Sequence, residues 1–213
     1  MNSSTRPCKV IVVCGSSSGV GKSTLVDRLS QLISNASALY FDAYQATTEF
    51  PPDLFEDLAN GKDVDPKHIR SPLFYRDLCA LREGRPVVDP WNREVTPGAY
   101  LIVEEPFGRE REGMAELIDY IACIQLPMDI ALARRLLRNL KQDFNHLPTE
   151  ERIQFMESTL LQYLNGGRIA YQKLYELVAA DCDLILDGLE TTDEMALAVI
   201  TDLKRRGILQ DQG

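Results

Sequence analysis

Short apolar runs alternate along the chain with segments of helical periodicity, in which apolar residues recur every three to four positions. The run Lys9-Val10-Ile11-Val12-Val13-Cys14 is almost continuously apolar and β-branched, which is typical of a strand buried on both faces. Strands separated by helices in this way form a parallel sheet covered by helices. The pattern therefore predicts an α/β fold, a three-layer α/β/α sandwich with a five-stranded parallel sheet. The expected strands are 9–14, 37–42, 100–103, a part of 118–126, and 183–186.

The expected helices follow from the same periodicity and from capping residues. Ser71-Pro72 is a favourable helix start, and Gly84 is expected to end that helix. Gly61 is expected to close a short helix, and Gly166-Gly167 to interrupt a long helical stretch. The expected helices are 22–33, 53–60, 72–83, 127–140, 149–180 and 191–206.

A glycine-rich segment, Gly15-Ser16-Ser17-Ser18-Gly19-Val20-Gly21-Lys22-Ser23-Thr24, lies between the first expected strand and the first helix. Glycines let successive N–H groups point at anionic oxygens, and the helix N-terminus adds partial positive charge. Lys22 would contact the β- and γ-phosphates, and Ser23 would ligate Mg²⁺. The full phosphate-loop pattern has glycine at Ser16, which leaves the geometry at the start of the loop open. These ten residues predict a P-loop NTPase fold with ATP, or another nucleoside triphosphate, and Mg²⁺ as cofactors.

The composition limits which binding partners and which cellular compartment are expected. The formal net charge of -9 argues against duplex nucleic acid as a partner, because phosphate binding needs a basic face. No apolar run approaches the ~20 residues that span a bilayer, and the N-terminus lacks the apolar region of a signal peptide. Five cysteines without C-x-x-C spacing indicate reduced thiols. We therefore expect a cytoplasmic protein without membrane or nucleic-acid partners.

Acidic residues follow two of the expected strands. Asp42 ends the second strand in Tyr40-Phe41-Asp42-Ala43-Tyr44, and ligands of parallel sheets bind at the carboxyl ends of strands. Its carboxylate is a candidate to deprotonate an attacking hydroxyl and to contact the Mg²⁺ shell, although Asp also caps turns. The strand at 100–103 ends in Glu104-Glu105. Glu104 is the preferred candidate for the metal and the substrate, with Glu105 as the alternative.

An arginine-rich helix segment supplies the opposite charge. The segment Pro127-Met128-Asp129-Ile130-Ala131-Leu132-Ala133-Arg134-Arg135-Leu136-Leu137-Arg138 brings Arg134 and Arg138 onto one helix face. Such a pair is suited to contact the transferring phosphoryl group and to complement its charge. The alternative is a solvated helix face whose arginines pair with surface acids.

The ordered set of phosphate loop, strand-end Asp42, Glu-ended strand, arginine helix and last strand resembles the uridine kinases and the wider P-loop small-molecule kinases, with phosphoribulokinase and pantothenate kinase. The resemblance implies a single kinase domain over residues 1–213, with an acceptor-binding insertion at about 43–98 and a lid at about 134–150. It implies catalytic roles for Lys22, Asp42, Arg134 and Arg138. It also implies that the protein can form a homo-oligomer. The substrate-binding residues that it implies are Asp42, Tyr44, Arg70, Trp91, Arg93, Glu104 and Arg168.

Parts of the chain depart from the family pattern. Glu105 stands where the family has glycine, and the family's histidine-aspartate element has no match in His68-Ile69-Arg70-Ser71. Trp91 takes the place of an aromatic that stacks on the nucleoside base, while a core anchor is the alternative role. The acceptor thus stays open between a nucleoside and another small molecule (a nucleoside monophosphate, a sugar acid or pantothenate). A nucleotide-binding switch without an acceptor is the competing class.

Overall fold

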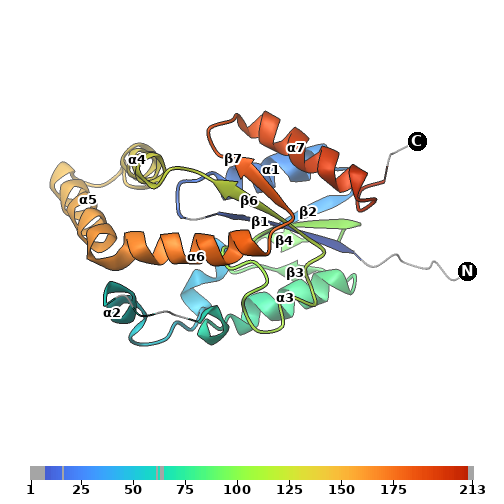
Figure 1. The fold of residues 1–213 in the computed structure, drawn as a ribbon, viewed down its shortest axis with the longest axis horizontal. Helices are drawn as coiled ribbons and strands as arrows, with labels where there is room; N and C mark the ends of the chain where they lie inside the picture. The colour runs from blue at the N-terminus through green and yellow to red at the C-terminus, as the bar shows by residue number, and fades with distance from the viewer. Residues whose placement is uncertain (1–7, 16, 61, 63–64, 211–213) are drawn as a thin grey trace, which may run out of the picture.

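The computed structural model describes residues 8–15, 17–60, 62 and 65–210. Five parallel strands form one sheet in the order β2-β5-β1-β6-β7, with β1 at its centre (Figure 1). The register pairs Ile11 of β1 with Ile102 of β5 and with Tyr120 of β6. The sheet confirms the predicted α/β/α architecture. Its strands are β1 Lys9–Gly15, β2 Ala36–Tyr40, β5 Tyr100–Glu104, β6 Tyr120–Gln125 and β7 Leu184–Asp187.

Helices cover both faces of the sheet. One face packs against α1 (Lys22–Leu32) and α7 (Thr192–Arg205), whose buried apolar residues join those of alternate strand positions. The opposite face packs against α3 (Pro72–Arg82) and α6 (Arg168–Ala180). Figure 1 shows the two pairs on either side of the strands. Both faces of β1 are therefore buried, as its continuous apolar run indicates.

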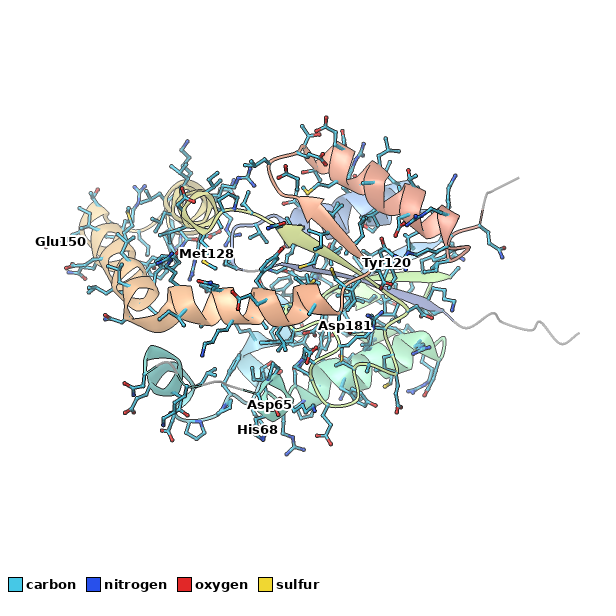
Figure 2. The ribbon with its side chains drawn as sticks, in the orientation of Figure 1. Asp65, His68, Tyr120, Met128, Glu150 and Asp181 are labelled. Carbon is cyan, nitrogen blue, oxygen red and sulfur yellow. The ribbon has the colours of Figure 1, made fainter. Side chains whose placement is uncertain are left out.

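The remaining elements surround the carboxyl ends of the strands. The helix α4 begins beside β6, and Met128 and Glu150, at the starts of α4 and α5, lie toward the same end of the molecule (Figure 2). Among the described residues, no helix is long and apolar enough to cross a membrane. The further helices and strands are α2 Leu54–Ala59, α4 Met128–Arg138, α5 Thr149–Gln162, β3 Val87–Val88 and β4 Glu94–Val95.

The structure differs from the sequence prediction after the second strand. The strand β2 ends at Tyr40, which pairs with Glu104, and Phe41–Thr47 form a 3-10 helix. Asp42 thus begins a turn rather than ending a strand. The antiparallel hairpin of β3 and β4 was not expected, because two-residue strands leave almost no periodicity in a sequence. Gly61 lies outside the described residues.

The long helical stretch is interrupted where the sequence predicts a break. Gly166 has a φ of 115°, which a residue with a side chain rarely adopts, and it separates α5 from α6. This change of direction lets α6 return across the sheet, where Leu174 and Val178 pack against the core. The N-terminal half of α6 consequently reaches the carboxyl end of β1.

Candidate active site

The phosphate loop connects β1 to α1 and is shaped by two glycines. Gly19 and Gly21 have φ values of 96° and 105°, in the left-handed region that favours glycine. A Cβ on Gly19 would lie 2.3 Å from the carbonyl oxygen of Ala131, so α4 packs directly on the loop. The Nζ of Lys22 donates to the carbonyl oxygen of Ser17 at 3.0 Å. Ser16, the departure from the loop pattern, lies outside the described residues.

A cavity of about 370 Å³ opens over this loop, and we call it the phosphate cavity. Lys22 and Ser23 line it from α1, Asp42 from the 3-10 helix and Glu104 from the end of β5. Arg138 of α4 lines it as well. The cavity thus collects one lysine, one arginine and three carboxylates, the third being Asp27, at the carboxyl edge of the sheet, where ligands of parallel α/β proteins bind.

The two adjacent glutamates at the end of β5 have different surroundings. The Oε2 of Glu104 accepts a hydrogen bond from Ser23 Oγ at 3.1 Å, and the side chain lines the phosphate cavity. Glu105 forms a buried ion pair with Arg111, and its Oε1 accepts the N–H of Phe107 at 2.9 Å. Successive residues of a strand point to opposite faces, which explains the separation. Only Glu104 of the two faces the phosphate loop.

Burial controls the ionisation of Glu104. Burial is the largest cause and raises the pKa of this carboxyl, Lys22 and the Ser23 hydrogen bond lower it, and the negative charge of Asp42 raises it, so that the pKa is about 7. At neutral pH Glu104 therefore lies near the midpoint of its titration. Positive charge brought beside it would favour the carboxylate.

The oxygen atoms of Ser23, Glu104 and Asp42 match the preference of Mg²⁺ for hard ligands. Among the described residues no cluster of three or more His, Cys, Asp or Glu side chains could hold a metal by itself. Mg²⁺ bound with a nucleotide commonly uses one or two carboxylates together with phosphate oxygens and water. The residues present therefore fit a metal that arrives with a triphosphate.

Arg134 and Arg138 of α4 both line a cavity beside Gly19 and Gly21, but they form different hydrogen bonds. Arg138 donates from Nη2 to Ser18 Oγ at 3.3 Å and also lies 3.5 Å from Asp143. Arg134 donates to the carbonyl oxygen of Gly188 at 3.1 Å and does not line the phosphate cavity. Of the pair chosen from the sequence, the structure places Arg138 at the phosphates' expected position and Arg134 against the loop after β7.

Comparisons with known proteins concern the chain as a whole. No protein-family profile matches the chain. The chain is 28% identical over 207 residues to a uridine kinase of Borreliella burgdorferi, which covers 92% of this chain and 94% of the relative. It is 28% identical over 189 residues to a uridine kinase of Borrelia duttonii (84% and 85%), and 26% identical over 188 residues to one of Staphylococcus epidermidis (83% and 86%).

Solved structures share the fold. A putative fructose transport system kinase from Silicibacter sp. TM1040 superposes with a TM-score of 0.52 at 16% identity, over 87% of this chain and 93% of that one. A possible uridine kinase from Bacillus stearothermophilus gives a TM-score of 0.51 at 14% identity, over 85% and 90%. The chain is thus similar in sequence to curated uridine kinases over more than four fifths of its length.

Of the residues expected to bind the acceptor, Asp42 and Glu104 line the phosphate cavity, whereas the others lie elsewhere. Tyr44 is fully buried and donates to Asp77 at 3.0 Å, so it supports the turn and does not face a cavity. Arg70 lines a second cavity, away from the phosphates. Arg168 is exposed at the start of α6 and does not line the phosphate cavity.

Trp91 and Arg93 belong to the β3–β4 hairpin. The Arg93 guanidinium lies 4.5 Å from the ring centroid of Trp91 and 4.6 Å from that of Tyr40. Asp89 accepts from the backbone N–H groups of both hairpin residues and pairs with the Arg93 side chain. Trp91 is 51% exposed and does not line the phosphate cavity, so it forms part of a stacked group on the hairpin.

Sequence reasoning missed several residues of the phosphate cavity. Asp27 lines it and accepts a hydrogen bond from Tyr40. Its position four residues after Ser23 places both side chains on one helix face, and this spacing could have identified it. Tyr171 lines the cavity from α6 and accepts from Arg135 at 3.3 Å. No local pattern links Tyr171 to the loop, because the return of α6 brings it there.

The raised pKa of Glu104 predicts a pH-dependent effect of Glu104→Gln on stability without nucleotide. In the unfolded chain the carboxyl titrates near its ordinary value, so the folded protein loses stability as pH rises from about 4.5 to about 7. Glutamine does not titrate, so the Glu104→Gln variant does not undergo this pH-dependent loss of stability. We expect the Tm difference between variant and wild type to grow in favour of the variant between pH 5 and pH 8, measured by calorimetry.

The matched control is Glu157→Gln, since Glu157 is exposed on α5. Its Tm difference from the wild type should stay constant over the same pH range. A Tm difference for Glu104→Gln that does not change with pH would contradict the assigned burial effect.

Proposed function

We propose that the protein is an ATP-dependent kinase that transfers the γ-phosphoryl group to a hydroxyl of a small molecule. The observation that carries the proposal is the convergence of Lys22, Ser23, Asp42 and Glu104 on one cavity over the phosphate loop. Nucleotide binding without phosphoryl transfer needs only the phosphate loop and the metal ligands. An unpaired carboxylate such as Asp42 beside them adds a group that can accept a proton.

Each residue of the phosphate cavity has a separate role in the proposed reaction. Lys22 and the loop N–H groups bind the β- and γ-phosphates, and Ser23 with Glu104 holds Mg²⁺, which when bound offsets phosphate charge. The acceptor oxygen forms a bond to the γ-phosphorus while the bond to the β–γ bridging oxygen breaks. The hydroxyl proton passes to the Asp42 carboxylate. Arg138, which hydrogen-bonds Ser18, stabilises the negative charge of the transferring group.

The acceptor that we propose first is a nucleoside, because the relatives of known name are uridine kinases. The structure supplies aromatic surface for a flat base near the phosphate cavity, where Phe41, Phe50 and Phe107 line the wall. Nucleoside monophosphates, sugar acids and pantothenate are the alternative acceptors. A nucleotide switch without an acceptor remains the competing function.

The test is ATP consumption with Mg²⁺ in a panel of nucleosides, nucleoside monophosphates, sugars, sugar acids and pantothenate. We expect at least one compound to raise turnover at least tenfold above the rate without acceptor, with formation of a phosphorylated product by mass spectrometry. A panel without any stimulation, while ATP still binds, would contradict the kinase function and favour the switch.

A further inference from the structure

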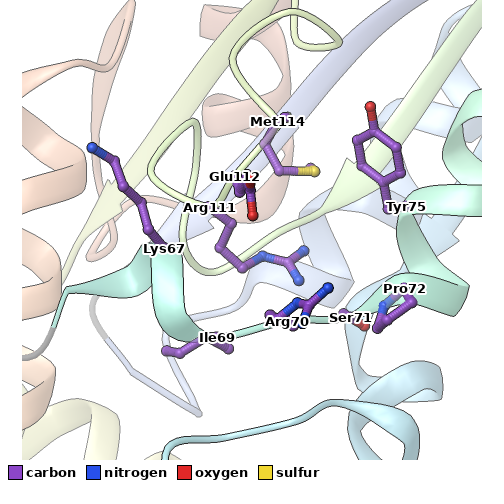
Figure 3. A pocket seen from close by; sticks show the side chains of 10 residues that line it. Lys67, Ile69, Arg70, Ser71, Pro72, Tyr75, Arg111, Glu112 and Met114 are labelled. Carbon is purple, nitrogen blue, oxygen red and sulfur yellow. The ribbon is translucent and has the colours of Figure 1, made fainter.

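The described part of the chain contains a second cavity, outside the phosphate cavity, with a volume of about 430 Å³ (Figure 3). It lies between the short turn Pro66–His68, the start of α3 and the loop that follows β5. Figure 2 places Asp65, which precedes this turn, and His68, its last residue, well apart from Met128 of α4. The volume is within the range of sites for small organic molecules.

Its lining is cationic in an acidic protein. Lys67, Arg70 and Arg111 line it together with a single carboxylate, Glu112. Figure 3 shows Arg70 and Arg111 entering the space between Lys67 and Tyr75. The side chains of Lys67 and Arg70 form no ion pair with any of the described residues. Lys67 interacts electrostatically with Glu110, and both Lys67 and Arg70 are exposed, so an anion bound in the cavity would give these two cations a direct charged partner.

Arg111 is the buried cation of the cavity lining, and its contacts hold it in place. Its side chain is 4% exposed, forms the buried ion pair with Glu105, and lies over the rings of Phe41 at 4.9 Å and Phe107 at 5.6 Å. The buried Nε of Arg111 has no hydrogen-bond partner among the described residues. A buried donor left unpaired is unfavourable by about 1–3 kcal/mol, so a donor of this kind beside a cavity points to a bound acceptor atom.

The rest of the lining suits an organic molecule. Met114 and Ile69 are buried and supply apolar surface, and Ser71 and Tyr75 carry hydroxyl groups. Gly113 has a φ of 78°, and a Cβ there would lie 2.8 Å from the Tyr75 ring, so the loop approaches the ring as closely as a glycine allows. An apolar floor with a few convergent polar groups is typical of small-molecule sites.

We propose that the second cavity binds a carboxylate or phosphate group of a small organic molecule, with Lys67 and Arg70 as the contacting cations and Arg111 as the fixed cation beneath them. This inference rests on the proposed kinase function only where that molecule is the phosphate acceptor. The acceptor is one source of such an anion, because Phe41 and Phe107 line the phosphate cavity and pack on Arg111. A separate effector is the other source.

The experiment measures binding without turnover. Calorimetric titrations in saturating Mg·ADP, which occupies the phosphate loop, compare uridine 5′-monophosphate with uridine and gluconate with sorbitol. Within each pair the compounds differ chiefly in the anionic group. We expect at least one anion to bind at least tenfold more tightly than its uncharged partner. Arg70→Gln and Lys67→Gln should each reduce that preference at least fivefold.

The control variant is Arg85→Gln, which removes an exposed arginine of the same insertion that pairs with Glu83. It should keep the full preference. Absence of a preference in both pairs, or a preference that survives Arg70→Gln, would overturn the proposal. Circular dichroism of each variant distinguishes a lost site from a lost fold.

Turnover then separates the two sources. An acceptor is converted to a phosphorylated product, and Arg70→Gln raises its KM, whereas an effector changes the rate without being consumed. The proposed function fails if no compound of the wider panel is phosphorylated. The proposed anion site in the second cavity is contradicted by the binding measurements alone. Failure of this site and failure of the proposed kinase function are therefore distinguishable.

Discussion

Replacing Asp42 with asparagine is expected to lower kcat by about 10²- to 10⁴-fold, the usual contribution of a general base. Affinity for Mg·ATP should change little, because asparagine keeps the size of the side chain and one oxygen ligand. Asp42 lines the phosphate cavity and is exposed in the 3-10 helix, where an acceptor hydroxyl can reach it. Single-turnover kinetics with the best acceptor, beside nucleotide titrations, provides the measurement.

A second readout distinguishes this role from general damage to the site. The charge of Asp42 raises the pKa of Glu104, so Asp42→Asn should lower the pH at which Glu104 titrates. Asp129→Asn, which alters an exposed aspartate in the first turn of α4, should change neither kcat nor this titration. Retained phosphoryl transfer in Asp42→Asn would exclude the general-base role.

The fold was predictable because its signals are local. The apolar run of β1, the loop glycines and the capping residues of the helices each lie within a few positions of one another. Capping at Thr191 illustrates this, because its Oγ1 accepts from the backbone N–H of Glu194, and Glu194 Oε2 accepts from the backbone N–H of Thr191. Local rules of this kind predict the element order and, with it, the parallel sheet.

The site was less predictable because long-range contacts decide it. Glu104 and Glu105 are adjacent and chemically identical, and their contacts with Ser23 and Arg111 give them different surroundings. Arg134 and Arg138 share a helix face, yet the position of α4 on the loop sends one to Gly188 and the other to Ser18. Charges and periodicity along a chain do not specify such distances.

The acceptor region was the least predictable part. Tyr44 follows Asp42 by two residues, but the 3-10 helix turns it into the core toward Asp77. Arg70 and Arg111 are 41 positions apart and meet only at the second cavity. Insertions in a common fold are shaped by their own packing, so a family pattern has little power there.

Lys22→Ala is expected to weaken ATP binding by roughly 10- to 150-fold, since a hydrogen bond to a charged group contributes about 1.5–3 kcal/mol. Turnover with saturating ATP should fall by about 10²- to 10³-fold, as for other groups that stabilise developing charge. Among the described residues, the Lys22 Nζ donates one hydrogen bond, to the Ser17 carbonyl oxygen at 3.0 Å, so it can turn to an arriving phosphate. Fluorescent nucleotide titration and steady-state kinetics measure the two effects.

The Lys204→Ala variant is the control for the lost charge, because Lys204 lies in the last turn of α7, far along the chain from the loop. ADP and ATP provide a sharper comparison within Lys22→Ala itself. A lysine that contacts the β- and γ-phosphates should lose more affinity for ATP than for ADP, whereas a lysine that only shapes the loop through Ser17 should weaken both equally. Equal losses would show that Lys22 shapes the loop and does not contact the γ-phosphate. The proposed phosphoryl transfer would then lack its principal cation.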